Sequence, residues 1–571
     1  MKTLQRLKPK QSLFNDFYVF DVETNGLRAK SDAFIFGVIY GFNFIKVLYS
    51  VDDFKKEFEN ERYKKKKVFA HNAEYDLSVI YDNIYDFDSK AIFNNRFIYA
   101  TNGNAQFADS FNIYATSVKE IGKLINLQKL EIEDEYKEGE FKGKVTQRMI
   151  DYCIRDCEII YKALYEIFND CGTIKITIAG LSMEYYRRFY QPFNIDYNEH
   201  VKEFYASYFG GRTECFFIGK KKGYCYDINS MYPYAMVNAF FPNPRNLKKE
   251  YGISVKRFIN HYLKYYEGCA ELELFHVEHY YGFLPVRHEG KLIFPTGHLK
   301  GTWNFNELRF ALKNKIIQIK RVKSITYAPR MKSIFKSYVE NQYNERKMAV
   351  SPLKREILKK RLNTLYGKFA QRIKSEMIYI HDINEQYDEV KRYMSERKLL
   401  KIHPFSASRA DCFIEIKSAR GGVYHSIPVF SSYITSFARV YLLEFLLKYQ
   451  QNEPLYCDTD SIFLAKDPKI LESNELGAWK KEDKVITEIR GLKNYSYISE
   501  GKIKDKIKGI PRKAEKTGDV YRYKTLVKTK ESMRRNIESG IEIEREKILK
   551  LTYDKRKVDK SGNTRPLCFE T

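Results

Sequence analysis

Residues 456–463 read Tyr-Cys-Asp-Thr-Asp-Ser-Ile-Phe and place two aspartates, Asp458 and Asp460, between short apolar segments. The flanking residues 454–456 and 461–464 have the composition of strands, so the pattern predicts a β-hairpin with both carboxylates at its tip. Neighbouring carboxylates repel each other unless a cation or a proton intervenes. A divalent metal ion is the simplest such cation, and paired metal ions are typical of phosphoryl transfer. The hairpin therefore indicates a metal site.

Charge is unevenly distributed along the chain, which has 571 residues and a net charge of +26. Residues 1–170 carry 25 Lys and Arg against 27 Asp and Glu, whereas residues 171–571 carry 74 against 46. A basic remainder behind a neutral first third indicates a polyanion bound mainly by the later domains, and this length allows about three or four domains. A generally lysine-rich composition is the alternative.

Nine scattered cysteines include no Cys-x-x-Cys pair, which argues against a zinc site and against a disulfide framework. A reduced, cytoplasmic protein is the simplest interpretation. The first ten residues lack the apolar core of a signal peptide, and no stretch approaches 18 uncharged apolar residues. No membrane contact is therefore expected.

The first third of the chain predicts an α/β domain. Residues 17–20 and 33–49 contain apolar runs typical of strands, and residues 147–168 have helical periodicity. The acidic stretch 131–140 predicts a solvent-exposed loop.

The later part mixes helical and irregular patterns. Residues 251–330 are expected to be irregular, whereas residues 336–372 are helical and basic. Ser351 and Pro352 interrupt this stretch as N-cap and first helical residue, so two antiparallel helices are expected. Residues 427–448 predict a strand followed by an apolar helix.

Three pairs of polar residues in the first third have spacings that place both members on one face. One pair lies two residues apart on a strand, and the other two lie four residues apart at helical spacing. Each pair alone is usually a surface coincidence. Together the four carboxylates can hold two metal ions, one activating a water and the other stabilising the leaving oxygen, while a tyrosine orients the water. The pairs are Asp21 with Glu23, Asn72 with Asp76, and Tyr152 with Asp156.

These pairs resemble the Asp-x-Glu, Asn-x-x-x-Asp and Tyr-x-x-x-Asp motifs of the DnaQ-like 3′–5′ proofreading exonucleases. The resemblance implies an RNase H-like domain with Asp21, Glu23, Asp76 and Asp156 as metal ligands. It also implies that a frayed 3′ end is held by Thr24, His71, Asn72, Tyr75, Ser110 and Phe111.

Three later segments resemble motifs A, B and C of family B DNA polymerases, in the order of that family. They are Asp-Ile-Asn-Ser-Met-Tyr-Pro at 227–233, Lys-Lys-Arg-Leu-Asn-Thr-Leu-Tyr-Gly-Lys at 359–368, and the hairpin at 456–463. The resemblance implies a right-hand palm, fingers and thumb. Asp227 and Asp460 are the expected metal ligands, with Asp458 in support and the Ile228 carbonyl completing the site. The expected cofactors are two divalent ions per site, Mg²⁺ with Mn²⁺ as an option.

The second basic helix carries a candidate triphosphate-binding face. Residues spaced four, four and three apart share one side of a helix. Basic residues there can neutralise phosphate, and a tyrosine can stack under the incoming base. Tyr232 is expected beneath the sugar, where its ring leaves no space for a 2′-hydroxyl. Lys354 and Lys360 are expected on the solvated side of the helix. The face itself consists of Arg355, Lys359, Asn363 and Tyr366, with Lys347 as a further phosphate contact.

Several elements resemble DNA contacts of the same polymerases. Tyr208, Gly210 and Gly211 match a Tyr-x-Gly-Gly element that holds primer-template between the two sites, and paired glycines let the backbone approach a phosphate. The register of the Lys-x-Tyr element stays open, because Lys493 precedes both Tyr495 and Tyr497. The expected DNA contacts beyond the editing site are Tyr208, Gly210, Gly211, Ser230, Gly367, Thr435, Arg439, Lys493 and Tyr497.

Spacing between the motifs leaves room for two insertions, which with this chain length resembles the protein-primed subgroup of small linear phage genomes and linear plasmids. The resemblance implies that the first insertion docks a terminal protein and that the second encloses the template for processive strand displacement. The expected partners are template and primer DNA, dNTPs and a terminal protein, with the polymerase as a monomer in the host cytoplasm. The expected domains are exonuclease 1–185, palm 186–238 and 425–507, insertions 239–335 and 373–424, fingers 336–372, and thumb 508–571.

Two alternatives remain at this point. One is a family B polymerase that extends a nucleic-acid primer or needs none, and the other is a catalytically silent DNA-binding scaffold. Loss of a metal carboxylate would mark the scaffold, and all seven candidate carboxylates are present.

Overall fold

The computed structural model describes residues 1–9, 13–81, 84, 87, 89–93, 96–131, 139, 141–372, 375–380, 382–396, 398–404, 412–417, 423–511, 514–527, 531, 541–548 and 553–570. Most of the predicted acidic loop at 131–140 and a smaller part of the predicted insertion at 373–424 lie outside these residues.

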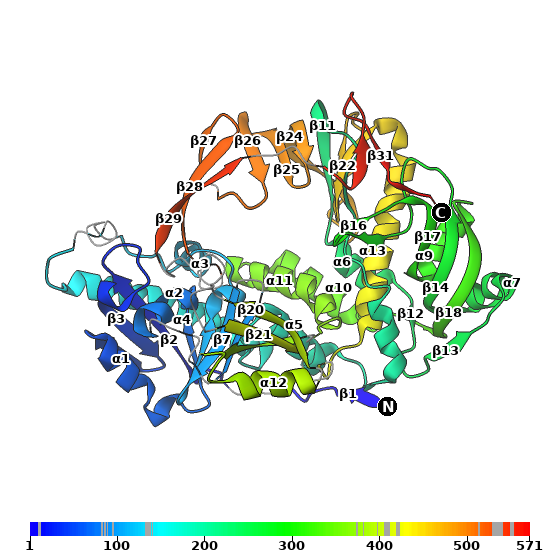
Figure 1. Cartoon of the computed structure of the whole chain (residues 1–571). Coiled ribbons are helices and arrows are strands. Elements are labelled where there is room, and N and C mark those ends of the chain that lie inside the picture. Colours follow the sequence, from blue (N-terminus) through cyan, green and yellow to red (C-terminus); the bar gives the residue numbers. More distant parts are fainter. Residues whose placement is uncertain are drawn as a thin grey trace.

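A seven-stranded mixed sheet, the first sheet, forms the N-terminal part of the molecule (Figure 1). Along β2, Phe17 and Val19 pack toward α4, whereas Phe20 and Val22 pack toward α1 and α2 on the opposite face. The elements are β2 Phe17–Thr24, β3 Phe34–Gly41, β4 Phe44–Leu48, α1 Val51–Phe58, β5 Lys67–Ala70, α2 Ala73–Tyr81, β6 Ser89–Phe93, β7 Arg96–Asn102, β8 Ala105–Asp109, α3 Val118–Leu124 and α4 Gln147–Cys171. The strands and the helix predicted in this region are confirmed.

A second seven-stranded sheet, the central sheet, has the order β10-β22-β23-β11-β24-β25-β26 and joins segments far apart in the chain. The predicted hairpin is confirmed as β22 and β23. Residues 428–448 form one helix, so the predicted strand there is wrong: Pro428 occupies the first helical turn, and apolar side chains are buried around the helix. The elements are β10 Thr213–Cys215, β11 Gly219–Ile228, α6 Met231–Asn238, α13 Pro428–Lys448, β22 Pro454–Asp458, β23 Ser461–Leu464, β24 Trp479–Gly491, β25 Asn494–Ser499 and β26 Lys502–Ile507.

A third sheet, with the order β12-β18-β14-β17-β32, fills the region that was expected to be irregular. That expectation is wrong, and β18 alone spans 15 residues. The elements are β12 Phe241–Pro242, β13 Lys248–Tyr251, α7 Val255–Arg257, β14 Tyr266–His276, β17 Thr296–Asn304, α9 Phe305–Lys313, β18 Ile317–Met331 and β32 Cys568–Phe569.

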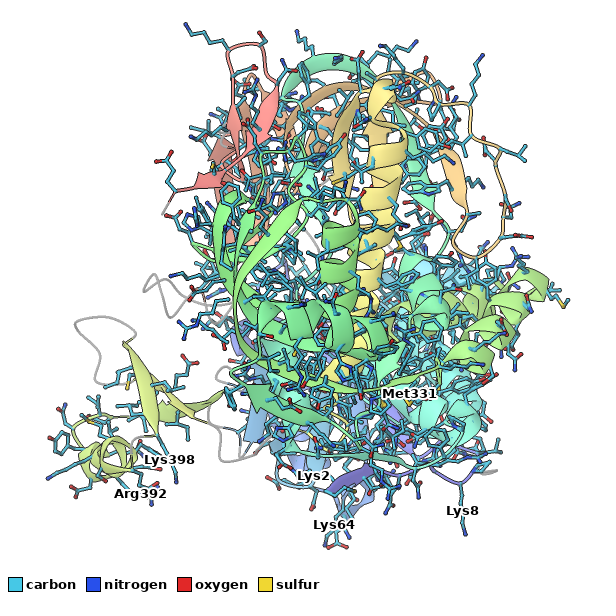
Figure 2. All side chains as sticks on the ribbon, turned by 90° about the vertical axis from the view of Figure 1, so that its right-hand side faces the viewer. Lys2, Lys8, Lys64, Met331, Arg392 and Lys398 are labelled. Atoms are coloured by element: carbon cyan, nitrogen blue, oxygen red, sulfur yellow. The ribbon has the colours of Figure 1, made fainter. Side chains whose placement is uncertain are left out.

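Two helices follow as predicted, α10 Lys336–Met348 and α11 Pro352–Lys368, and the Ser351 hydroxyl caps α11 by accepting a hydrogen bond from the Lys354 N–H. A small module then projects from the body, as its labelled residues Arg392 and Lys398 show in Figure 2. It contains β19 Ser375–Ile380, α12 Tyr387–Ser395, β20 Leu399–Pro404 and β21 Cys412–Lys417.

The strands of the C-terminal part belong to three different sheets. Strands β27 Glu515–Thr517, β28 Val520–Leu526 and β29 Glu542–Ile548 form a sheet that arches from the central sheet toward the first sheet (Figure 1). The chain then returns as the hairpin β30 Arg556–Val558 and β31 Thr564–Pro566, and β32 joins the third sheet. Among the described residues, no helix combines the length and hydrophobicity needed to cross a lipid bilayer.

Candidate functional site

Three carboxylates meet at one end of the central sheet. Asp227 lies near the end of β11 and Asp458 ends β22, and both are in register with Ser461 of β23. Asp460 lies in the turn between β22 and β23, where its carbonyl oxygen accepts a hydrogen bond of 2.7 Å from the Ile228 N–H. Strand pairing therefore brings together residues that lie more than 200 positions apart in the chain.

Burial makes this cluster suitable for a cation. It raises the pKa of Asp227 to about 7, with the Asp460 carboxylate as the next cause, and it also raises the pKa of Asp460. Clustered carboxylate and carbonyl oxygens with raised proton affinity are the donors that hard divalent ions prefer. Asp458 differs, because Lys493 Nζ lies 3.1 Å from one of its oxygens and the Thr213 hydroxyl donates to the other at 3.1 Å. Asp227 and Asp460 therefore fit a metal ion best, and the Ile228 carbonyl stays a predicted ligand.

Two stacked tyrosines lie beside these carboxylates. The rings of Tyr232 and Tyr366 have centroids 4.2 Å apart at 30°. Burial is the main cause that raises the pKa of both tyrosines, and the Asp460 carboxylate is a smaller cause in the same direction. The predicted basic face of α11 is open to solvent, since its members Arg355, Lys359 and Asn363 are exposed, as is Lys347 on α10.

Two further predicted DNA contacts, Ser230 and Gly367, lie at the start of α6 and near the end of α11. Ser230 has φ 57° directly before α6, and a Cβ built on Gly367 near the end of α11 would meet no atom within 4 Å. Gly367 therefore leaves space for a ligand next to Tyr366, while DNA contact by Ser230 stays a prediction.

A second acidic cluster lies on the first sheet. Strand alternation directs Asp21 and Glu23 toward α4, which supplies Tyr152, Cys153 and Asp156. Ligand atoms of Asp21, Glu23 and Cys153 lie within 4.8 Å of one another, the one such group found in the described part of the chain. Asp76 reaches the cluster from α2, where its carboxylate accepts a 3.3 Å hydrogen bond from the Val22 N–H.

Burial and neighbouring carboxylates also raise pKa values in this second cluster. Burial and then Asp156 raise the pKa of Asp21 to about 7, and burial and then Asp21 raise that of Asp76 well above its ordinary value. Lys129, a residue that sequence reasoning missed, forms an ion pair with Asp156 and lies 4.5 Å from the centre of the Tyr152 ring. These donors fit divalent ions, with Lys129 placed to offset part of the charge.

A family model described as "DNA polymerase type B, organellar and viral" matches residues 126–420, just over half of the chain. The chain belongs to this family. It is a DNA-directed DNA polymerase, and family B polymerases generally use divalent metal ions, so the predicted family and activity are confirmed.

Curated relatives and solved structures agree with this assignment. The chain is 27% identical to a DNA-directed DNA polymerase of Enterobacteria phage PRD1, over 74% of this chain and 72% of that protein. It is 26% identical to a probable DNA polymerase of Podospora anserina, over 71% of this chain but 37% of that longer protein. Its fold is similar to phi29 DNA polymerase complexed with primer-template DNA and incoming nucleotide, with TM-score 0.67, 15% identity, and 94% and 99% of the two chains covered.

The face of α11 that lies opposite the exposed basic residues packs against α4 of the first sheet. Lys354 and Lys360 were expected to be solvated, and this is wrong. Lys354 and the fully buried Arg361 lie 2.7 and 2.6 Å from the carboxylate of Asp170, and Lys360 donates to the Ile113 carbonyl. Lys354 and Arg361 therefore lie at the C-terminal end of α4, where positive charge is favoured.

The Tyr-x-Gly-Gly element packs directly on the polymerase turn, the tip of the hairpin formed by Asp458, Thr459 and Asp460. A Cβ on Gly211 would lie 2.6 Å from the Thr459 hydroxyl oxygen, whereas one on Gly210 would meet no atom within 4 Å. The Arg212 carbonyl accepts a 2.7 Å hydrogen bond from the Thr459 N–H. Tyr208 precedes these glycines and is half-buried.

Two predicted template contacts face the protein interior. Thr435 is 1% exposed and bonds back to its own helix, while Arg439 is 4% exposed and pairs with Glu307. Arg439 also donates to the carbonyls of Phe209 and Gly210. Both side chains are therefore buried, and Arg439 supports the loop of Gly210 and Gly211. DNA contact by Thr435 and Arg439 stays a prediction.

The two tyrosines of the Lys-x-Tyr element differ in burial. Tyr495 is 7% exposed and packs against Tyr456 and Phe463, so its ring belongs to the core. Tyr497 lies on the same strand face and is more exposed, and Lys493 reaches Asp458. Tyr497 is therefore the more accessible of the two tyrosines, and its pairing with Lys493 in DNA contact stays a prediction.

Predicted contacts with a 3′ end divide into accessible and internal residues. Asn72 is exposed, whereas Thr24 is buried and shares a 2.5 Å hydrogen bond with the half-buried Tyr75. His71 bonds to Ser110 and to the Thr116 carbonyl, and burial lowers its pKa to about 4. Ser110 is fully buried, and the centre of the Phe111 ring lies 5.4 Å from that of the His71 ring. Contact of Ser110 and Phe111 with a 3′ end stays a prediction.

Proposed function

We propose that this polymerase replicates a linear phage or plasmid genome by protein-primed, strand-displacing synthesis and edits its product with a 3′–5′ exonuclease. The observation that carries the two activities is the pair of separate acidic clusters, one on each seven-stranded sheet. Two segments inserted between the motif-bearing elements, 239–335 and 373–424, support the protein-primed part.

For synthesis, bound Mg²⁺ ions would activate the primer hydroxyl and neutralise the triphosphate. Asp227, Asp460 and the Ile228 carbonyl would hold these ions, and Lys493 keeps Asp458 oriented beside them. The Tyr232–Tyr366 stack forms a floor for the incoming nucleotide, and the exposed basic residues of α11 bind its phosphates.

For editing, Asp21, Glu23, Asp76 and Asp156 would hold the metal ions. Tyr152 orients the attacking water, and Lys129 stabilises the negative charge that develops on the cleaved phosphate. Tyr208 and the glycines after it guide the primer end between the two clusters.

Partner and domain assignments complete the proposal. The insertion at 239–335 docks a terminal protein whose hydroxyl primes synthesis, and the insertion at 373–424 encloses the template. One copy of the chain acts alone in the host cytoplasm. Residues 1–185 are the exonuclease domain, 336–372 the fingers, and 508–571 the thumb, with the palm at 186–238 and 425–507.

The two activities are tested with Mg²⁺, dNTPs and primed template. Asp460→Ala is expected to abolish extension while 3′ degradation survives, and Asp21→Ala combined with Glu23→Ala is expected to do the reverse. Extension by Asp460→Ala would show that the two-site assignment is wrong.

Priming requires its own measurement, the transfer of a labelled nucleotide onto a co-purified partner protein. Transfer supports protein priming. No transfer with any candidate partner, together with normal extension of DNA primers, would favour the alternative of a nucleic-acid primer.

A further inference from the structure

The C-terminal hairpin β30–β31 packs against the segment that connects β10 to β11. The Thr564 N–H donates to the Phe216 carbonyl at 3.1 Å, and the Ile218 N–H donates to the Gly562 carbonyl at 2.8 Å. A Cβ on Gly562 would lie 2.0 Å from the Ile218 carbonyl oxygen, so the two backbones touch. The hairpin is therefore fixed against the central sheet.

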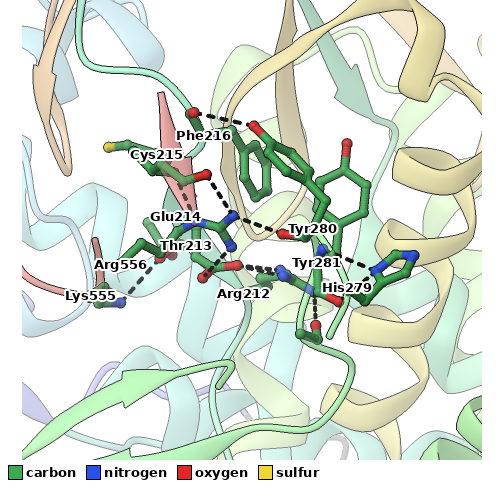
Figure 3. Close-up of polar contacts among 12 residues, drawn as sticks. Arg212, Thr213, Glu214, Cys215, Phe216, His279, Tyr280, Tyr281, Lys555 and Arg556 are labelled. Atoms are coloured by element: carbon green, nitrogen blue, oxygen red, sulfur yellow. Dashed lines mark hydrogen bonds and ion pairs between the residues drawn. The ribbon is translucent and has the colours of Figure 1, made fainter. Parts of the chain in front are cut away.

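A buried triad of charges lies beneath this contact (Figure 3). Glu214 of β10 is fully buried between two arginines, Arg212 and Arg556, which are 1% and 2% exposed. Arg212 Nε donates to Glu214 Oε2 at 2.7 Å, and Arg556 Nη1 lies 3.5 Å from Glu214 Oε1. Since burying charges is costly even when they are paired, such a triad is weak evidence for stability and suggests a geometric role.

Backbone carbonyls complete the fit of both guanidinium groups. Arg556 donates to the Tyr280 carbonyl at 2.8 Å and, through Nε, to the Thr564 hydroxyl at 2.8 Å. Arg212 donates to the Gly282 carbonyl at 2.8 Å. One triad thus joins the C-terminal hairpin, β10 and the segment between β14 and β15 (Val286–His288).

The same short segment supports the polymerase turn. The Arg212 carbonyl accepts the Thr459 N–H at 2.7 Å, and the Thr213 hydroxyl donates to Asp458 Oδ1 at 3.1 Å. Thr459 has φ 63°, a left-handed conformation that a β-branched residue adopts only when its surroundings enforce it. Lys555 donates to the Thr213 carbonyl, so the C-terminal segment reaches the support at a second point.

We propose that Arg556 is a positioning residue for nucleotide addition, which holds the strained Asp458–Thr459–Asp460 turn in place through Glu214 and Arg212. This inference rests on the proposed role of that turn in holding metal ions. Without Arg556, the triad loses its anchor in the hairpin, and the two carboxylates shift relative to Asp227.

The test compares Arg556→Met with Arg565→Met, which removes the same charge from an exposed position of the same hairpin. For each variant, kcat and the dNTP KM are measured in single-nucleotide addition, together with the Mg²⁺ concentration giving half-maximal rate. Arg556→Met is expected to lower kcat by about 10- to 100-fold and to raise the Mg²⁺ requirement severalfold, with little change in KM, because displaced catalytic groups of this kind cost about that much. Arg565→Met is expected to match the wild type.

Degradation of single-stranded DNA serves as the internal control, because the editing cluster lies on another sheet of the same chain. It is expected to keep its rate and its Mg²⁺ dependence in Arg556→Met. Arg556→Lys, which retains the charge but cannot reach all three acceptors, is expected to fall between Arg556→Met and wild type, and it replaces Arg556→Met if that variant does not fold.

Three outcomes would overturn the proposal: equal behaviour of Arg556→Met and Arg565→Met, a loss confined to primer-template affinity, or parallel losses at both sites for Arg556→Lys. Failure of the proposed function is distinguishable, because it appears as extension by Asp460→Ala, whereas failure of the positioning role leaves that variant inactive.

Discussion

Replacing Gly211 with alanine tests how closely the catalytic turn is held. The new Cβ would lie 2.6 Å from Thr459 Oγ1, 2.7 Å from Cγ2 and 3.0 Å from Cβ. Carbon atoms in contact prefer about 3.5–4.0 Å, so the two residues must separate by about 1 Å. Rotation of the Thr459 side chain cannot relieve this, because both branches and the Cβ itself are too close.

A displacement of about 1 Å in a catalytic group lowers the rate by about 100-fold. We therefore expect Gly211→Ala to reduce kcat for single-nucleotide addition by about 30- to 100-fold, while degradation stays within about twofold of wild type. The measurement is single-turnover primer extension by rapid quench, with saturating dNTP and a primer protected from degradation.

Gly210→Ala is the matched comparison, since its Cβ would meet no atom within 4 Å. The rescue is Thr459→Gly in the Gly211→Ala background, because it removes the clashing side chain and glycine accepts the positive φ. Equal kcat values for the two alanine variants, or no recovery in the double variant, would refute the reasoning.

Three other predictions follow from the contacts described. Lys129→Met is expected to slow degradation at least about tenfold and leave extension unchanged, measured on single-stranded and primed DNA, since it removes the cation beside Asp156. Asp170→Asn is expected to lower the free energy of unfolding by about 2–4 kcal/mol in urea titrations and to raise the dNTP KM, because it leaves Arg361 buried without its ion pair. In EDTA, wild-type stability is expected to fall as pH rises from about 4 to about 7, because the folded chain holds a proton on Asp21 that the unfolded chain releases. Asp21→Asn removes the part of this loss that Asp21 causes, about 2–4 kcal/mol above pH 7, so calorimetry at pH 8 should show a higher transition temperature for the variant and near pH 4 no difference.

The sequence predicted those elements that are determined by residues close together in the chain, such as the start of α11 and the hairpin β22–β23. Ser351 and Pro352 mark the start of α11 by a capping hydroxyl and a preset φ, and both act within one helical turn. The hairpin of Asp458 and Asp460 follows equally from neighbouring residues. The family motifs then paired Asp227 with this hairpin, which spacing alone could not have done.

The third sheet escaped prediction because its strands do not alternate regularly. Register shifts between Glu271 and Leu272 and between Glu273 and Leu274 interrupt the pairing of β14 with β18. A bulge breaks the two-residue period by which a strand is recognised.

Residues that act through tertiary contact were also missed. Lys129 lies between α3 and α4 in a segment without periodicity, and nothing local places it near Asp156. Arg361 resembles its lysine neighbours in sequence, yet it is buried against Asp170 because α11 lies on the end of α4. Which side of a basic helix meets solvent depends on its partner, which a single sequence does not supply.

The distance in sequence between Glu214 and Arg556, 342 residues, has a consequence for biosynthesis. At about 5–20 residues per second, a ribosome needs roughly 20 to 70 seconds to supply Arg556 after Glu214. All four carboxylates of the first sheet, and the helices that carry them, have been translated before this interval begins. Domains fold as units during synthesis, so a nascent chain can acquire the means to trim DNA before it can copy it.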